Sequence, residues 1–323
     1  MLNSNSSPNQ NWYPNFLSSK SLKILLILIL FINFAVKMIY CWAPLPVILS
    51  SVTFDDTFYF LKVARNIALD HRVSFDGIEM TNGFQPLWEI LLVPIMYLIK
   101  DLRTALSLSL TLSSVLSIGT LLFLYKIVKT LCNERAAFLA VIIWSTNVGL
   151  IRMETSGMEF SLSCFMLSWI IYFYIKHFGM KEESISKNYR LLGFLSGFVI
   201  LARTDAIFII PSFLIFILFQ KKDKFKKTLS FTISSSIVLA PYFIWNLVCF
   251  GHIMPISGAV KERMSNKIIE QTYNGYFNLS YIEKYISYYF WQGFLDITGT
   301  YNIYLIRLEN FLPFLGKNLD ALP

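Results

Sequence analysis

Two adjacent carboxylates, Asp55 and Asp56, stand in the stretch TFDDTFYFLK, just after a strongly apolar run. A carboxylate in a low-dielectric cavity can accept the proton of an attacking hydroxyl, and burial beside a second acid raises its pKa towards the range that a base needs. The same pair could instead cap a helix, because acidic side chains are favoured at a helix N-terminus. Residue type alone leaves both interpretations open.

The pattern around the pair predicts a helix over 53–69. Asp55, Tyr59, Lys62 and Asn66 are separated by four, three and four residues, so they are expected to share one polar face of that helix. Asp56 falls on an apolar stripe instead. The two carboxylates are therefore expected to point in different directions.

Further charged residues stand at breaks between apolar runs. Glu154 and Glu159 flank the motif TSGM, and Arg203 and Asp205 lie in LARTDAIF. An ionisable group at the head of a membrane span is costly unless it lies in a polar cavity or at the interface. Arg203 could hold a phosphate through two parallel hydrogen bonds, or it could simply pair with Asp205 and close a helical hairpin. Glu159 could likewise be a helix first-turn acid.

The composition indicates a membrane protein. Of 323 residues, 55% are hydrophobic and 15% are charged, whereas soluble domains carry about 25% charged residues. The net charge of +8 comes from basic stretches between apolar runs, which favours cytoplasmic loops over nucleic-acid binding. The four cysteines form no CxxC pair, so neither a zinc nor a redox motif is expected.

We expect an all-α polytopic membrane protein with about 7–9 membrane segments, since a span needs about 20 apolar residues. The basic loops place 43–85 on the outer side, as a first extracytoplasmic loop that carries amphipathic helices. The run 86–99 is short and contains Pro94, and a complete crossing there would put residue 153 on the wrong side. The candidate runs are 22–42, 86–99, 104–125, 136–152, 158–176, 191–202, 206–219 and 228–250.

Three regions follow from this pattern. Residues 1–20, rich in Ser and Asn, are expected to be a disordered cytoplasmic N-terminus. Residues 21–250 form the transmembrane domain. Residues 251–323 are expected to be an extracytoplasmic or interfacial C-terminal segment, truncated if the chain is a fragment, and Lys261 lies there in a Pro- and Gly-containing loop.

The stretch TNGFQPLW, residues 81–88, completes a pattern that is similar to that of a known protein family. The acidic pair, the amphipathic helix, the short polar loop and this Pro-led run resemble the GT-C superfamily of integral membrane glycosyltransferases. The protein O-mannosyltransferases and the lipid A aminoarabinose transferase are most similar, mainly over residues 20–160. Relatives often have His-Pro-Pro or Lys-Pro-Pro where this chain has Gln85, Pro86 and Leu87. Gln85 lacks the charge of Lys and the metal affinity of His.

The resemblance implies a glycosyltransferase whose donor is a sugar on polyprenyl phosphate. It implies Asp55 as the general base with Asp56 beside it, and transfer of a hexosyl or pentosyl unit to a lipid, glycan or protein acceptor. With only three histidines and no metal-ligand spacing, no divalent metal is expected. The expected substrate-binding residues are Tyr59, Asn82, Gln85, Glu154, Glu159, Arg203, Asp205 and Lys261.

Two other functions fit the same residues. A transporter or flippase could use the acids and Arg203 along a translocation path, although no internal repeat relates two halves of the chain. A degenerate, non-catalytic relative would tolerate Asp55→Asn. In each case we expect an integral, multi-pass protein of a membrane such as the bacterial plasma membrane.

Overall fold

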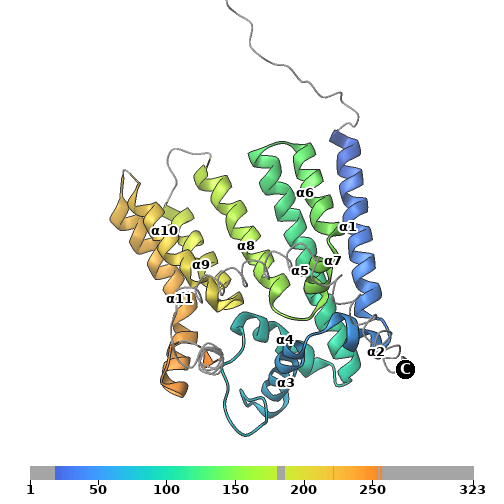
Figure 1. Ribbon diagram of the computed structural model, residues 1–323. Helices are drawn as coiled ribbons and strands as arrows, with labels where there is room; N and C mark the ends of the chain where they lie inside the picture. Colours follow the sequence, from blue (N-terminus) through green and yellow to red (C-terminus); the bar gives the residue numbers. More distant parts are fainter. Residues whose placement is uncertain (1–18, 180–185, 221, 254, 257–323) are drawn as a thin grey trace, which may run out of the picture.

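The computed structural model describes residues 19–179, 186–220, 222–253 and 255–256 (Figure 1). Over these residues the regular secondary structure is helical, apart from one isolated bridge between Ser74 and Met80 in the loop 71–85. The elements are α1 Ser19–Cys41, α2 Leu45–Val47, η1 Ile48–Val52, α3 Asp55–Asp70, α4 Pro86–Leu98, α5 Leu102–Leu131, α6 Glu134–Thr146, α7 Val148–Thr155, α8 Phe160–Tyr174, η2 Ile175–Gly179, α9 Ser186–Ala202, η3 Thr204–Phe208, α10 Ile209–Leu218 and α11 Lys224–Phe250.

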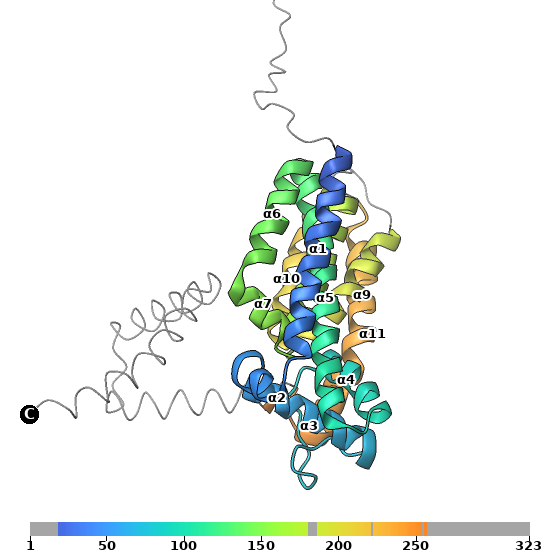
Figure 2. The same ribbon diagram turned by 90° about the vertical axis from the view of Figure 1, so that its right-hand side faces the viewer.

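The long helices lie side by side as a bundle, and α2, α3 and α4 gather at one end of it (Figures 1 and 2). The run expected at 86–99 becomes α4, which packs against α3 at this end. Only three residues separate the end of α4 from the start of α5. This arrangement agrees with the expectation that 86–99 makes no complete crossing of its own.

Three described helices are long and apolar enough to cross a membrane, namely α1, α5 and α11. A fourth span results if α6 and α7, which meet at 69°, count as one broken helix. The all-α fold class is therefore confirmed for the described residues. The number of 7–9 segments and the outer location of 43–85 stay predictions.

The break between α6 and α7 has a local cause. The Asn147 side chain accepts a hydrogen bond from Leu150 N, at 3.0 Å, and so caps the start of α7. The Ser145 carbonyl near the end of α6 accepts from Asn33 Nδ2 of α1, at 2.9 Å. A backbone carbonyl at the end of α6 and a backbone N–H at the start of α7 thus each have a side-chain partner, because backbone polar groups left without partners are costly in an apolar environment.

Helices α9 and α11 pack most extensively against each other. Gly193 and Gly197 face α11, and a Cβ at these positions would collide with the Phe231 carbonyl and with Val238. Small residues four apart let two helix backbones approach closely. This contact fixes the end of α9, where Arg203 follows.

Helix α3 forms where the sequence predicts it, and Phe60, Val63 and Ala64 are among its buried apolar residues. Phe60 and Val63 lie on the stripe that contains Asp56. Phe58 and Leu69, on the other apolar side, remain 38% and 48% exposed. The apolar face that contains Phe60 and Val63 therefore packs against the rest of the protein, while Asp56, at the start of the same stripe, remains exposed.

Candidate active site

The acidic pair begins α3. Asp55 and Asp56 are the first two residues of the helix and both are exposed. Asp55 Oδ1 accepts a hydrogen bond from Asp56 N, at 3.0 Å, so it satisfies one backbone donor at the helix start, although the N-cap residue itself is Phe54. Each carboxylate also keeps room to accept a proton or a substrate hydroxyl.

Thr57 joins this helix start to the turn of the TSGM motif. Its Oγ1 accepts from Phe54 N, at 3.2 Å, and donates to the Ser156 carbonyl, at 2.7 Å. The indole Nε1 of Trp88, on α4, donates to the next carbonyl, that of Gly157, at 3.1 Å. Gly157 has φ +77°, a conformation that other residues rarely adopt. Two side chains thus fix the turn beside the acidic pair.

Glu159 follows this turn and precedes α8. Its side chain is buried, with Oε1 at 3.6 Å from Arg203 Nη1, and its Oε2 has no hydrogen-bond partner among the described residues. Burial raises the pKa of the Glu159 carboxyl above its ordinary value. Arg203 opposes this rise of the pKa, while the charges of Asp56 and Asp205 add to it. The carboxyl is therefore electrostatically connected to the acidic pair through Asp56.

Arg203 stands between the end of α9 and the start of η3. Its Nε donates to both carboxylate oxygens of Asp205, each at 3.0 Å, and the two side chains are 42% and 66% exposed. The mutual pairing considered from the sequence is thus present. An exposed pair of this kind contributes only about 0–1 kcal/mol. The pair can therefore rearrange at little cost in free energy.

Gln85 connects α4 to the same place. Its Oε1 accepts from Thr204 N, at 2.9 Å, and so satisfies a backbone donor at the first residue of η3. Gln85 therefore lies beside Arg203 through this bond. In the structure its role is to anchor the break between α9 and η3.

Glu154 lies apart from this cluster. Its Oε2 is 2.6 Å from Lys37 Nζ of α1, and its Oε1 accepts from Trp144 Nε1, at 2.8 Å. Lys37 also donates to Ser117 Oγ, at 2.7 Å. The Lys37 and Glu154 side chains are 0% and 1% exposed. The position expected to bind substrate is occupied by a closed, buried ion pair.

Asn82 and Tyr59 are likewise engaged in structural contacts. Asn82 is buried, donates to Asn246 Oδ1 at 3.1 Å and accepts from Ile256 N at 2.9 Å. Tyr59 Oη is 2.7 Å from Thr81 Oγ1, and burial raises the pKa of this phenol above its ordinary value. These residues hold the loop 71–85 to α3 and α11, although Tyr59 also lies in the field of Asp56.

Sequence reasoning missed four residues of this region. Lys37 could have been found as a single cation inside an apolar run, a pattern typical of a paired or functional residue. Glu89 stands inside another apolar run, and its two carboxylate oxygens are buried without a hydrogen-bond partner among the described residues. Nothing in the sequence indicated the contacts of Thr57 and Trp88, because their partners are the backbone carbonyls of Ser156 and Gly157, which are distant in sequence. Lys261 lies outside the described residues.

The arrangement offers carboxylates and one guanidinium. The structure brings Arg203 close to Glu159 and Asp205, with Gln85 bound to the neighbouring Thr204, and the charge of Asp56 reaches Glu159. Among the residues that the structure describes, no group of three or more His, Cys, Asp or Glu is placed to hold a metal ion. Chemically, such a cluster can accept a proton and hold an anionic phosphate.

Comparison with known families places this cluster in context. Residues 86–245 match the sequence model of the family described as dolichyl-phosphate-mannose-protein mannosyltransferase. The chain belongs to the GT-C superfamily. As a GT-C protein it is integral to a membrane, and the family is one of mannosyltransferase-like glycosyltransferases. No curated protein and no solved structure matches the chain.

The matched segment contains only part of the cluster. Glu159, Arg203 and Asp205 fall within 86–245, while the acidic pair of this GT-C chain precedes it. The family match and the acidic pair are therefore separate observations. The hydrogen bond from Thr57 to the Ser156 carbonyl is the contact that joins the two segments beside the cluster.

Proposed function

We propose that this protein transfers a sugar from a polyprenyl-phosphate carrier to a hydroxyl of a lipid, glycan or protein acceptor on the extracytoplasmic face of the membrane. One observation carries the proposal. The acidic start of α3 is held, through Thr57 and the Ser156 carbonyl, against the turn that precedes Glu159, whose carboxylate lies 3.6 Å from Arg203 Nη1. Carboxylates and a guanidinium at the same end of an apolar bundle support the proposal of a base and a phosphate-binding cation in one site.

The proposed reaction is a direct displacement. The acceptor oxygen forms a bond to the anomeric carbon, its proton passes to the Asp55 carboxylate, and the bond from the anomeric carbon to the phosphate oxygen breaks. The bond electrons leave with the polyprenyl phosphate, and the configuration at the anomeric carbon inverts. No nucleotide and no covalent enzyme intermediate is needed, because phosphate is already a good leaving group.

Positive charge near the departing phosphate stabilises the transition state. Arg203 is proposed for this role because its guanidinium is half-exposed and held only by carboxylates that it can exchange. Glu159 and Asp205 then orient the guanidinium, and Gln85 holds the backbone beside it. Since Glu159 is buried and one of its oxygens has no hydrogen-bond partner among the described residues, this oxygen is proposed to accept a hydrogen bond from a sugar hydroxyl.

The assignment of the base to Asp55 rests on the resemblance of the pair to that of GT-C enzymes. Asp56 is the acid whose charge reaches Glu159 and Tyr59. Asp56 is therefore proposed as the supporting acid that connects the base to the rest of the cluster.

The test measures sugar transfer by membranes supplied with labelled polyprenyl-phosphate sugars. Asp55→Asn keeps the shape of the side chain but cannot take the proton, and loss of a general base costs about 10²–10⁴-fold in rate. Asp56→Asn, compared at matched membrane abundance, should cost less. Transfer by Asp55→Asn at the parent rate would contradict the assignment, and loss of transfer in Asp56→Asn alone would move the base to Asp56.

A further inference from the structure

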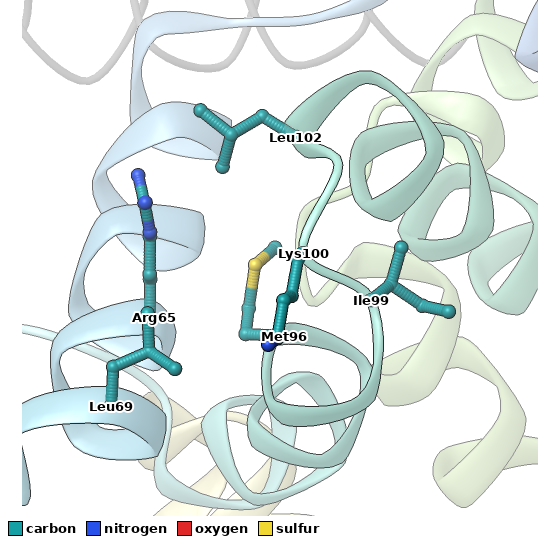
Figure 3. A pocket seen from close by; sticks show the side chains of 6 residues that line it. All are labelled: Arg65, Leu69, Met96, Ile99, Lys100 and Leu102. Carbon is teal, nitrogen blue, oxygen red and sulfur yellow. The ribbon is translucent and has the colours of Figure 1, made fainter.

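A pocket of about 210 Å³ opens where α3, α4 and the start of α5 meet (Figure 3). Arg65 and Leu69 line it from α3, and the opposite wall comes from the segment 96–102. Met96, Ile99 and Leu102 make that wall apolar, and Lys100 joins them. The lining is therefore an apolar surface to which two cationic side chains contribute.

The two cations have no partner within the described part of the chain. Neither Arg65 nor Lys100 makes an ion pair or a hydrogen bond there. The neighbouring acid Asp101 is turned to Thr104, whose N and Oγ1 donate to it at 2.8 and 2.6 Å. Long cationic side chains place their methylene stems on apolar surface and their charged ends in the polar layer.

The surroundings of the pocket are apolar and exposed. Ile90, Tyr97 and Leu98 of α4 are 61%, 63% and 73% exposed, and Leu102 is 53% exposed. In a membrane protein, an exposed apolar surface of this kind is suited to contact with lipid. Arg65 and Lys100, which have no partner among the described residues, lie beside it, as Lys and Arg side chains do near lipid headgroups.

The pocket is separate from the candidate active site. Arg65 lies ten residues beyond Asp55 on α3, about 15 Å along the helix at 1.5 Å per residue. None of the clustered residues Asp55, Asp56, Glu159, Arg203 and Asp205 lines it. A ligand here would therefore act on the position of α3 and α4 and not on the reacting atoms.

We propose that this pocket binds an anionic phospholipid of the surrounding bilayer. The phosphate lies between Arg65 and Lys100, and the glycerol and first methylenes of the acyl chains lie against Leu69, Met96 and Leu102. The amphiphilic character of the lining selects a lipid over a soluble anion. The choice of a bilayer phospholipid over the polyprenyl-phosphate donor rests on the separation from the acidic cluster.

The experiment uses the full-length protein, purified in a neutral detergent and stripped of lipid. Thermal unfolding is followed with added phosphatidylglycerol or with phosphatidylcholine of the same acyl chains. A ligand that binds only the folded state raises the unfolding midpoint. Phosphatidylglycerol should raise the midpoint more than phosphatidylcholine, and Arg65→Gln/Lys100→Gln should lose most of that difference.

Lys62→Gln is the matched control, because Lys62 is an exposed cation of α3 that does not line the pocket. It should keep the phosphatidylglycerol effect. A loss as large as that of Arg65→Gln/Lys100→Gln would show a diffuse charge effect and overturn the proposal. Equal shifts with both lipids would overturn it as well.

Two measurements on the unaltered protein keep the proposal testable if the double variant fails to fold. The phosphatidylglycerol effect should shrink as salt rises, since exposed ionic contacts are screened; an unchanged effect counts against the site. Polyprenyl phosphate, added in competition, should leave bound phosphatidylglycerol in place. Displacement would assign the pocket to the donor instead.

Discussion

Glu154 and Glu159 flank the same four-residue turn, yet the structure gives them opposite surroundings. Glu154 is closed in by Lys37 and by the Trp144 indole, so both of its oxygens have short contacts. Glu159 reaches Arg203 only at 3.6 Å, and its second oxygen has no hydrogen-bond partner among the described residues. Both oxygens of Glu154 are thus paired, whereas Glu159 is buried with one oxygen that can still accept a hydrogen bond.

This difference separates the two roles that a buried acid can have. Breaking a fully paired buried charge destabilises the fold, because the remaining partner is left uncompensated. An incompletely paired charge already carries a desolvation cost, and such costs are typical of functional sites. The turn between the two acids connects them, since it is held by Thr57 and Trp88 beside Asp55.

The largest expected effect on stability comes from opening the Lys37–Glu154 pair. Lys37→Met leaves the Glu154 carboxylate buried without its cation, which should destabilise the fold by about 3–5 kcal/mol. Lys37→Met/Glu154→Gln removes both charges, and the amide carbonyl that it introduces can still accept from Trp144, so most of the loss should be recovered. Chemical unfolding in detergent measures both changes.

Lys23→Met controls for this prediction, because Lys23 is an exposed cation of the same helix α1. It should leave the free energy of unfolding nearly unchanged. If the double variant were as unstable as Lys37→Met alone, the pair would not be the source of the effect. The contrast with Glu159 would then lose its physical basis.

A smaller effect is expected from Thr57. Thr57→Val removes a hydroxyl that bonds two backbone groups, at the helix start and at the Ser156 carbonyl. Leaving such buried groups without partners costs about 1–3 kcal/mol. Because the turn positions Glu159 against the acidic pair, the rate of sugar transfer should fall as well, with little change in the affinity for the donor.

Thr57→Ser keeps the hydroxyl and should restore both the stability and the rate. Recovery of stability without recovery of the transfer rate would show that the methyl group, and not the hydrogen bonds, matters for the site. Measuring the maximal rate and the half-saturating donor concentration separately distinguishes the positioning of the acids from donor binding.

The sequence predicted the helical class, the helix of the acidic pair and most helix positions, because apolar length and helical spacing carry that information. It also predicted that Arg203 and Asp205 interrupt two apolar runs. It did not predict that Glu154 pairs with Lys37 or that Asn82 pairs with Asn246, since these partners are 117 and 164 residues away. Contacts between residues so distant in the sequence cannot be predicted from local spacing, so the structural partners of Glu154 and Asn82 became visible only in the fold.

The dependence on contacts distant in the sequence also explains why Glu159 and Gln85 could be proposed as site residues while their partners could not be predicted. A charged residue at the head of an apolar run marks a polar site, but the identity of its partner depends on tertiary packing. In the structure, the break after α9 brings Arg203 to Glu159 and Thr204 to Gln85. The residues of the candidate site thus stand at the ends of helices, and sequence patterns predict the positions of helix ends only approximately.

The smallest effect on stability, and the sharpest contrast with Glu154, is expected from Glu159→Gln. Burial raises the pKa of the Glu159 carboxyl in the folded protein above its value in the unfolded chain, so the folded state binds this proton more tightly. The ionised carboxyl therefore lowers stability, by an amount that is absent below the ordinary pKa and grows as pH rises through the raised one. Glu159→Gln removes this cost.

The unfolding midpoint of Glu159→Gln, measured relative to that of the unaltered protein, should therefore rise as pH rises. At neutral pH, Glu159→Gln should stabilise the fold, whereas Glu154→Gln should destabilise it. Sugar transfer by Glu159→Gln should fall. A Glu159→Gln protein that is as unstable as Glu154→Gln at neutral pH would show that both acids serve the fold alone.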